Sequence, residues 1–224
     1  MAELKSMSDL IRNRIKKAGA DYLSTDNISQ FIQEGELEKL QDEVEGKVQS
    51  LLESLIIDTV NDHNTKETAH RVAKMYIQEV FKGRYVAEPK NTEFPNVKQY
   101  DDMYIIGPIH FNSFCAHHLL PIIGDAWIGV VEPTELMGLS KFHRLTRWIM
   151  ERPSIQEEST VMIADLIESK LKPSGLGIIV KANHSCVSIR GVKDKDSEMV
   201  SSVMRGIFRN DYNVKQEFLN LIKM

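Results

Sequence analysis

The chain has 224 residues, of which 42% are hydrophobic and 27% are charged, and its formal net charge at pH 7 is −4. This composition is typical of a globular protein with a buried core and excludes a disordered chain, and the acidic balance argues against a general polyanion-binding surface. Since no stretch is long and apolar enough to span a bilayer and the N-terminus lacks the apolar run of a secretory signal, we expect a cytoplasmic protein that contacts no membrane.

The first part of the chain has a helical pattern. From about residue 4 to residue 81, apolar residues recur at three- and four-residue spacing and no proline interrupts them. The clearest helix is predicted from Thr68 to Phe81, and Gly83 is expected to end it. From Glu88 to Pro95 the composition shifts to Pro, Asn and Thr, which indicates a connecting loop. We therefore predict a helical region of residues 1–95 followed by a second domain of residues 96–224.

Short apolar runs follow that loop, and four of them are predicted as strands: Met103 to Ile109, Ala126 to Val131, Gly177 to Ala182 and Cys186 to Val192. A helical pattern from about Lys141 to Leu171 separates the second run from the third. Proline disfavours helix at the residue before it, so this pattern should divide near Arg152-Pro153.

The last two predicted strands would form a hairpin around residues 183–185. A final helix is expected from about Glu198 onward, and the tail of residues 216–224 is also expected to be helical. This order of elements predicts an antiparallel α+β domain rather than a parallel doubly wound one.

Both cysteines of the chain lie in histidine clusters, Cys115-Ala116-His117-His118 and His184-Ser185-Cys186. The Cys-x-x-His spacing lets one segment supply a thiolate and an imidazole to the same metal ion, while a remote segment supplies a third ligand. Three protein ligands leave the fourth tetrahedral position of Zn²⁺ free for water, which is typical of a catalytic site. A closed structural site, with a second histidine as fourth ligand, is the alternative that the residues leave open.

Five collinear motifs resemble the GTP cyclohydrolase I family, and the resemblance covers about residues 67 to 221. The motifs are Glu67-Thr68-x-x-Arg71-Val72-Ala73-Lys74-Met75-Tyr76, Ser113-x-Cys115-x-His117-His118, Gly138-Leu139-Ser140-Lys141-x-x-Arg144, Arg152-Pro153-x-x-Gln156-Glu157 and His184-x-Cys186-x-x-x-Arg190-Gly191. The resemblance implies an enzyme that opens the imidazole ring of the guanine of GTP by hydrolysis at carbon-8, releases formate and forms 7,8-dihydroneopterin triphosphate.

The resemblance also implies roles around the metal. Cys115, His118 and Cys186 would bind Zn²⁺, which makes water a nucleophile at neutral pH. His184 would be the general acid toward the purine ring, and His117 a second group for proton transfer. From the residues alone, either histidine could instead orient a metal ligand.

Substrate-binding residues are implied in the same way. Gln156 and Glu157 would recognise the guanine base, although the sequence alone favours Glu157-Glu158 as a solvated helix face or a partner of the helix dipole. The other implied positions, mainly cations for the triphosphate, are Arg71, Lys74, Leu139, Ser140, Lys141, Arg144 and Arg190. Any one of these cations would ordinarily be a surface charge. The chain departs from the family at Ala116, where an acidic residue is usual.

The family's fold is the tunnelling fold (T-fold), in which antiparallel sheets packed by helices join between subunits into a barrel. Active sites lie between the subunits of a homodecamer. We therefore expect an α+β tunnelling fold with an N-terminal helical appendage, with GTP and further copies of the chain as partners and with no nucleic acid.

Three alternatives to this function remain at this stage. One is a relative that releases formate but stops before the pterin ring closes. Another is a deazaguanine nitrile reductase of the same fold, which would need a cysteine nucleophile and a nicotinamide cofactor. The third is a zinc-stabilised nucleic-acid-binding module, which the acidic charge and the lack of a basic, aromatic-rich stripe disfavour.

Overall fold

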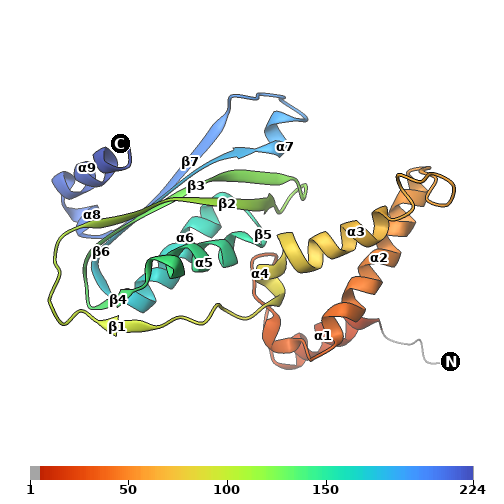
Figure 1. Cartoon of the computed structure of the whole chain (residues 1–224), viewed down its shortest axis with the longest axis horizontal. Helices are drawn as coiled ribbons and strands as arrows, with labels where there is room; N and C mark the ends of the chain where they lie inside the picture. The colour runs from red at the N-terminus through yellow and green to blue at the C-terminus, as the bar shows by residue number, and fades with distance from the viewer. Residues whose placement is uncertain (1–5, 224) are drawn as a thin grey trace. The chain divides into compact units, whose positions relative to one another are not determined.

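The computed structural model describes residues 6–223, which fall into two compact units, one up to Ala87 and one from Glu88 onward (Figure 1). We expected the division after residue 95. The segment after Ala87 belongs to the second unit, because β1 (Glu93–Pro95) pairs in antiparallel fashion with β4 (Glu135–Met137) and Glu88 forms a 2.5 Å ion pair with Lys170. Within the described residues, no helix combines the length and apolarity that crossing a membrane requires.

The first unit consists of helices joined by loops. They are α1 (Met7–Lys17), the short 3₁₀ helix η1 (Ser29–Phe31), α2 (Glu36–Ser54), α3 (Thr68–Lys74), the π-helical η2 (Met75–Val80) and α4 (Lys82–Tyr85). The predicted helix over 68–81 is confirmed, with a wider π turn in its second half. Gly83 does not end it as predicted, because this glycine lies buried inside α4. The first residues of the predicted helical pattern, 4 and 5, lie outside the described part of the chain.

The second unit is built around a five-stranded sheet with the order β5-β2-β3-β6-β7. All pairings are antiparallel except that of β5 with β2. The strands are β2 (Tyr104–Cys115), β3 (Pro121–Pro133), β5 (Pro153–Ser154), β6 (Pro173–His184) and β7 (Glu198–Gly206). The helices are α5 (Leu139–Met150), α6 (Gln156–Leu171), α7 (Ser185–Ser188), α8 (Ile207–Asn210) and α9 (Tyr212–Leu221). The predicted antiparallel α+β class is therefore confirmed.

Two predictions for the second unit are wrong. The predicted strand over 186–192 is instead α7 followed by turns, and the apolar side chains of those turns are exposed, Ile189 at 63% and Val192 at 81%. The predicted helix from Glu198 begins instead as β7, which pairs with β6 from Asn183↔Glu198 to Gly175↔Gly206. The backbone of β6 needs a hydrogen-bonding neighbour, and that tertiary requirement overrides the weak local preference of a half-exposed edge segment.

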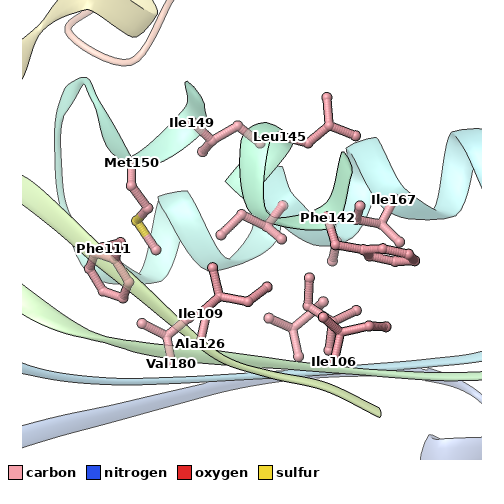
Figure 2. Packing of buried hydrophobic residues seen from close by; sticks show 14 of the residues in the cluster. Ile106, Ile109, Phe111, Ala126, Phe142, Leu145, Ile149, Met150, Ile167 and Val180 are labelled. Carbon is pink, nitrogen blue, oxygen red and sulfur yellow. The ribbon is translucent and has the colours of Figure 1, made fainter. Parts of the chain in front are cut away.

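Helices cover both faces of the sheet. Figure 2 shows Ile106, Ile109 and Val180 of the strands facing Phe142 and Leu145 of α5 in a cluster of buried side chains that also includes side chains of α6. On the opposite face, Phe208 and Phe218 of α8 and α9 pack against Ile179, with their ring centroids 5.3 Å apart. The division of the long helical pattern near Arg152-Pro153 is confirmed, since α5 ends at Met150 and α6 begins at Gln156. Helices therefore pack on both faces of the sheet, and the candidate site lies at one end of it, where β2 and β6 terminate.

Candidate metal centre

Cys115 and His118 lie in a tight turn at the end of β2. Cys115 is the last residue of the strand, its N–H donates to Leu120 O at 2.9 Å, and its carbonyl accepts from Leu119 N at 2.8 Å. Leu119 has φ 51°, a left-handed conformation that lets the chain reverse at once into β3. On the other side, Ala116 N donates to Ser154 O of β5 at 3.1 Å. The turn is therefore held from both sides.

His184 and Cys186 reach the same end of the sheet from β6. Both β2 and β6 run antiparallel to β3, so the carboxyl ends of β2 and β6 lie at the same end of the sheet. The register shows this directly, because Ile122 of β3 pairs with Ser113 of β2 and with His184 of β6. Cys186 follows in the single turn of α7. The antiparallel topology thus brings two segments about 70 residues apart to one place.

Three side chains form a group that could hold a metal ion: Cys115, His118 and Cys186, whose ligand atoms all lie within 4.8 Å of one another. In the part of the chain that the structure describes, this is the one such group of His, Cys, Asp and Glu side chains. Two thiolates and one imidazole are the donors that zinc prefers, so the chemistry of the residues fits this ion. Cys115 is buried, Cys186 is half-buried and His118 is exposed, which leaves the group open toward solvent on one side.

The two thiols affect each other. Burial and the neighbouring Cys115 thiol raise the pKa of Cys186 above its usual value. Two thiolates this close repel each other, so a cation between them is needed before both can stay deprotonated. The pair is therefore better suited to a shared metal ion than to two independent reactive cysteines.

Two further predicted residues adjoin the cluster. Arg190 Nη1 lies 2.9 Å from His118 Nε2, and His117 Nδ1 lies 3.7 Å from Cys115 Sγ. Both Arg190 and His117 are exposed. The structure thus brings a guanidinium and a second imidazole to the open side of the candidate metal centre.

His184 is bound to the start of α6. Its Nε2 lies 2.8 Å from Gln156 Oε1, and Gln156 is only 3% exposed. Burial lowers the pKa of His184, and the negative charge of Glu157 acts in the opposite direction, so Glu157 is close enough to influence the imidazole. Glu157 itself is exposed, and its side chain is available to a ligand.

The remaining predicted residues lie on two helices. Leu139, Ser140 and Arg144 are exposed in the first turns of α5, and Lys141 Nζ donates to Lys90 O at 2.8 Å. Arg71 and Lys74 are exposed on α3 of the first unit.

Sequence reasoning missed two hydroxyl groups that complete the site. The hydroxyl oxygens of Thr160 and Ser201 lie 2.7 Å apart, and both contact Gln156. Thr160 donates to the backbone carbonyl of Gln156, and Ser201 accepts from the side-chain amide of Gln156. Ser201 belongs to β7, which the sequence pattern predicted as helix, and no sequence signal places it beside Gln156. A correct strand prediction would have been needed first.

Comparisons of the sequence with a family model and with known proteins agree on one family. A family model described as GTP cyclohydrolase I matches residues 44–223. The chain is 36% identical over 181 residues to the GTP cyclohydrolase 1 of Haemophilus ducreyi, which covers 80% of this chain and 83% of that protein. It is 31% identical over 225 residues to the GTP cyclohydrolase 1 of Aliivibrio fischeri, with both chains covered in full. A solved structure of an archaeosine synthase QueF-Like in the apo form covers 54% of this chain and 97% of that chain at 11% identity, and its TM-score of 0.36 is too low to support an argument.

Proposed function

The chain belongs to the GTP cyclohydrolase I family, and from this membership we propose which of its residues carry the reaction. The protein is a GTP cyclohydrolase I. It opens the guanine imidazole ring of GTP by hydrolysis at carbon-8, releases formate and forms 7,8-dihydroneopterin triphosphate. The observation that carries the proposal is the convergence of Cys115, His118 and Cys186 within 4.8 Å. His117 lies beside Cys115, and His184 is two residues before Cys186.

Cys115, His118 and Cys186 would hold Zn²⁺, because two thiolates and an imidazole match its preferred donors and three ligands leave one position free. The bound ion would supply Lewis acidity, so that water is a competent nucleophile at neutral pH. In this proposal Cys115 would bind the ion from the buried end of β2, and the exposed His118 would be the ligand on the side that is open to solvent.

Two histidines would move protons. His184 would donate a proton to the imidazole nitrogen of the purine, which withdraws electrons from carbon-8 and makes it electrophilic. His117 is exposed beside Cys115 and would serve proton transfer as the ring opens and the ribose rearranges. Imidazole suits both steps because it exchanges protons near neutral pH.

Glu157 would select guanine. Its carboxylate can accept two hydrogen bonds, from the ring N–H and the exocyclic amino group of guanine. Its place next to Gln156, which contacts His184, supports this assignment, because a purine that contacts both His184 and Glu157 would present its imidazole edge to the histidine and its pyrimidine edge to the carboxylate. Adenine would leave that acceptor unsatisfied, which is a strong basis for discrimination.

The triphosphate would meet cations from several segments. Arg190 stands beside the metal ligands. Within one chain the C-terminal end of α5 lies next to Cys115, because residues 153 and 154 pair with the end of β2. The residues of the first turns of α5 would therefore reach the site from a neighbouring chain; these positions are Leu139, Ser140, Lys141 and Arg144. A helix N-terminus favours phosphate as well. Arg71 and Lys74 would be supplied to the site from a neighbouring chain.

We further propose that the chain assembles as a homodecamer of the tunnelling fold, with sheets of neighbouring copies joined into a barrel and active sites between subunits. The support is the sheet order, in which β7 is the last strand and presents one backbone edge without a partner strand in the described residues. Such an edge is suited to pairing with another copy.

The test is product analysis. Purified, zinc-loaded protein is incubated with GTP, formate is measured, and the mixture is oxidised to reveal fluorescent pterin. We expect formate and pterin in equal amounts. Formate without pterin would mean an enzyme that stops at ring opening, and neither product from a zinc-replete oligomer would refute the proposal.

Glu157→Gln tests recognition of the base, with Glu158→Gln as matched control, since Glu158 is an exposed carboxylate of the same helical turn. We expect kcat/KM for GTP to fall by about 100-fold or more in the first variant, because the amide turns one acceptor into a donor. The control should stay close to the wild type. Equal values for the two variants would remove Glu157 from the site.

A further inference from the structure

The side-chain amide of Gln156 is surrounded by groups that define its orientation. Its Nε2 lies 3.1 Å from Val180 O, 3.1 Å from Met199 O and 3.0 Å from Ser201 Oγ. Backbone carbonyl oxygens accept hydrogen bonds and cannot donate them. The atom that faces them must therefore be the NH₂ group.

The two hydroxyl groups settle the third contact. The Thr160 hydroxyl donates to Gln156 O at 2.7 Å, so its single hydrogen is used. Ser201 Oγ lies 2.7 Å from Thr160 Oγ1, and Ser201 must be the donor in that bond. The Ser201 oxygen is then left as an acceptor, so the two hydrogens of Gln156 Nε2 are shared among three acceptors. All contacts of the NH₂ group are consistent with one orientation of the amide.

This orientation determines the state of His184. Gln156 Oε1 faces His184 Nε2 at 2.8 Å and can only accept, so Nε2 carries a hydrogen. Turning the amide over would place Oε1 against two carbonyl oxygens and lose both hydrogen bonds in a site that is 3% exposed, which is unfavourable. A neutral imidazole has one N–H, so the lone pair of neutral His184 is on Nδ1.

We propose that Gln156 is a positioning residue that holds His184 in the Nε2–H tautomer and directs Nδ1 toward the substrate. The inference rests on the proposed role of His184 as proton donor. The proton given to the purine nitrogen leaves the Nδ1 of the imidazolium, while the Nε2–H remains bonded to Gln156 Oε1. Gln156 thus acts through His184, and Glu157 alone of this pair contacts the base.

Nitrogen NMR of the histidine rings tests this inference directly. The zinc-loaded protein is labelled with ¹⁵N in its seven histidines and studied at mildly alkaline pH, where imidazole is neutral. The His184 signals are identified by their absence from a His184→Asn spectrum. We expect a protonated Nε2 and an unprotonated Nδ1 at His184, and an Nδ1–H tautomer in the wild type would overturn the proposal.

Three variants separate positioning from a general structural effect. Gln156→Met removes the acceptor, so the single tautomer should be lost and single-turnover formate release should fall by about 10–100-fold, with unchanged zinc content. Gln156→Glu retains an acceptor toward His184 and should keep the Nε2–H signal. Its second oxygen faces the carbonyl oxygens of Val180 and Met199, so we expect a lower free energy of unfolding. Gln41→Met is the control, since Gln41 is also buried, at 8% exposure, and its Oε1 accepts from Gln78 Nε2 at 2.6 Å. It should alter neither readout.

The outcomes also distinguish this inference from the proposed function. The tautomer is measured without GTP, so a wild type that shows Nε2–H but releases no formate would refute the function and leave the positioning intact. A Gln156→Met variant with the wild-type tautomer and rate would refute the positioning alone. If Gln156→Met fails to fold, the wild-type spectrum still decides the question, because an Nδ1–H tautomer at His184 there overturns the proposal.

Discussion

Replacing Gly124 by alanine should disturb both the sheet and the site. Gly124 of β3 pairs with Ala182 of β6, two residues before the end of that strand at His184. A Cβ at Gly124 would lie 2.2 Å from Lys181 O and 2.5 Å from the Cβ of Ala182. Non-bonded heavy atoms normally approach to about 3.5 Å, and neither of these atoms can rotate away. The two strands must therefore separate by roughly 1 Å.

The magnitude follows from this separation. Overpacking of this kind lowers the free energy of unfolding by about 1–3 kcal/mol. The carboxyl end of β6 would move relative to β2, which displaces His184 from Cys115 and His118. A shift of about 1 Å in a reacting group can lower a rate about 100-fold. We therefore expect a loss of rate that is larger than the loss of stability alone would explain.

Two measurements check this prediction. Urea unfolding followed by tryptophan fluorescence gives the stability, and single-turnover formate release gives the rate of the folded protein. Gly46→Ala is the control, because Gly46 lies inside α2, where a Cβ would meet no atom within 4 Å, and alanine should stabilise that helix by about 0.5–1 kcal/mol. If Gly124→Ala matched the wild type in both measurements, the steric reasoning would be refuted. Reduced stability with a normal rate would show that strand spacing does not position His184.

Three further predictions concern the metal, the second core and alkaline pH. Cys186→Ser should abolish stoichiometric zinc in metal analysis, whereas a Ser188→Ala protein should retain it; equal zinc contents would remove Cys186 from the ligand set. Phe218→Ala should lower the free energy of unfolding by about 3–5 kcal/mol, because the ring is fully buried against Phe208, while Tyr212→Ala on the same helix, 73% exposed, should change it little. Burial raises the pKa of Tyr104 to about 12, above the value of about 10 in an unfolded chain, so ionisation favours unfolding there. The contribution of this tyrosine to the free energy of unfolding is complete below pH about 10 and is lost as the pH rises through about 12. The urea midpoint of Tyr104→Phe should therefore fall less steeply with pH than that of the wild type. Equal slopes of midpoint against pH in the two proteins would contradict this prediction.

Local features of the chain were predictable from the sequence. Cys115 and His118 are three residues apart, so one turn presents both, whatever the rest of the fold does. The division between α5 and α6 followed from Pro153, because proline restricts the residue before it. Three of the four predicted strands form, since their buried β-branched runs match the sheet core that they enter.

The sequence pattern failed where a segment depends on a distant neighbour. The segment after Glu198 has too few buried side chains to indicate a strand, and it becomes β7 because the edge of β6 is there to pair with it. The apolar residues after Cys186 suggested a strand, yet Ile189 and Val192 lie exposed in the turns beyond α7.

The sequence by itself therefore determined the type of the candidate ligands, the spacing within each cluster and the α+β class. Only the tertiary structure decided that Cys186 meets Cys115, and that Gln156 faces His184 through a network with Ser201. The physical reason is that spacing within a turn is a property of the covalent chain. Hydrogen bonds between segments far apart along the chain decide instead which strand ends lie at the same end of the sheet. Such bonds also decide which nitrogen of a histidine is protonated.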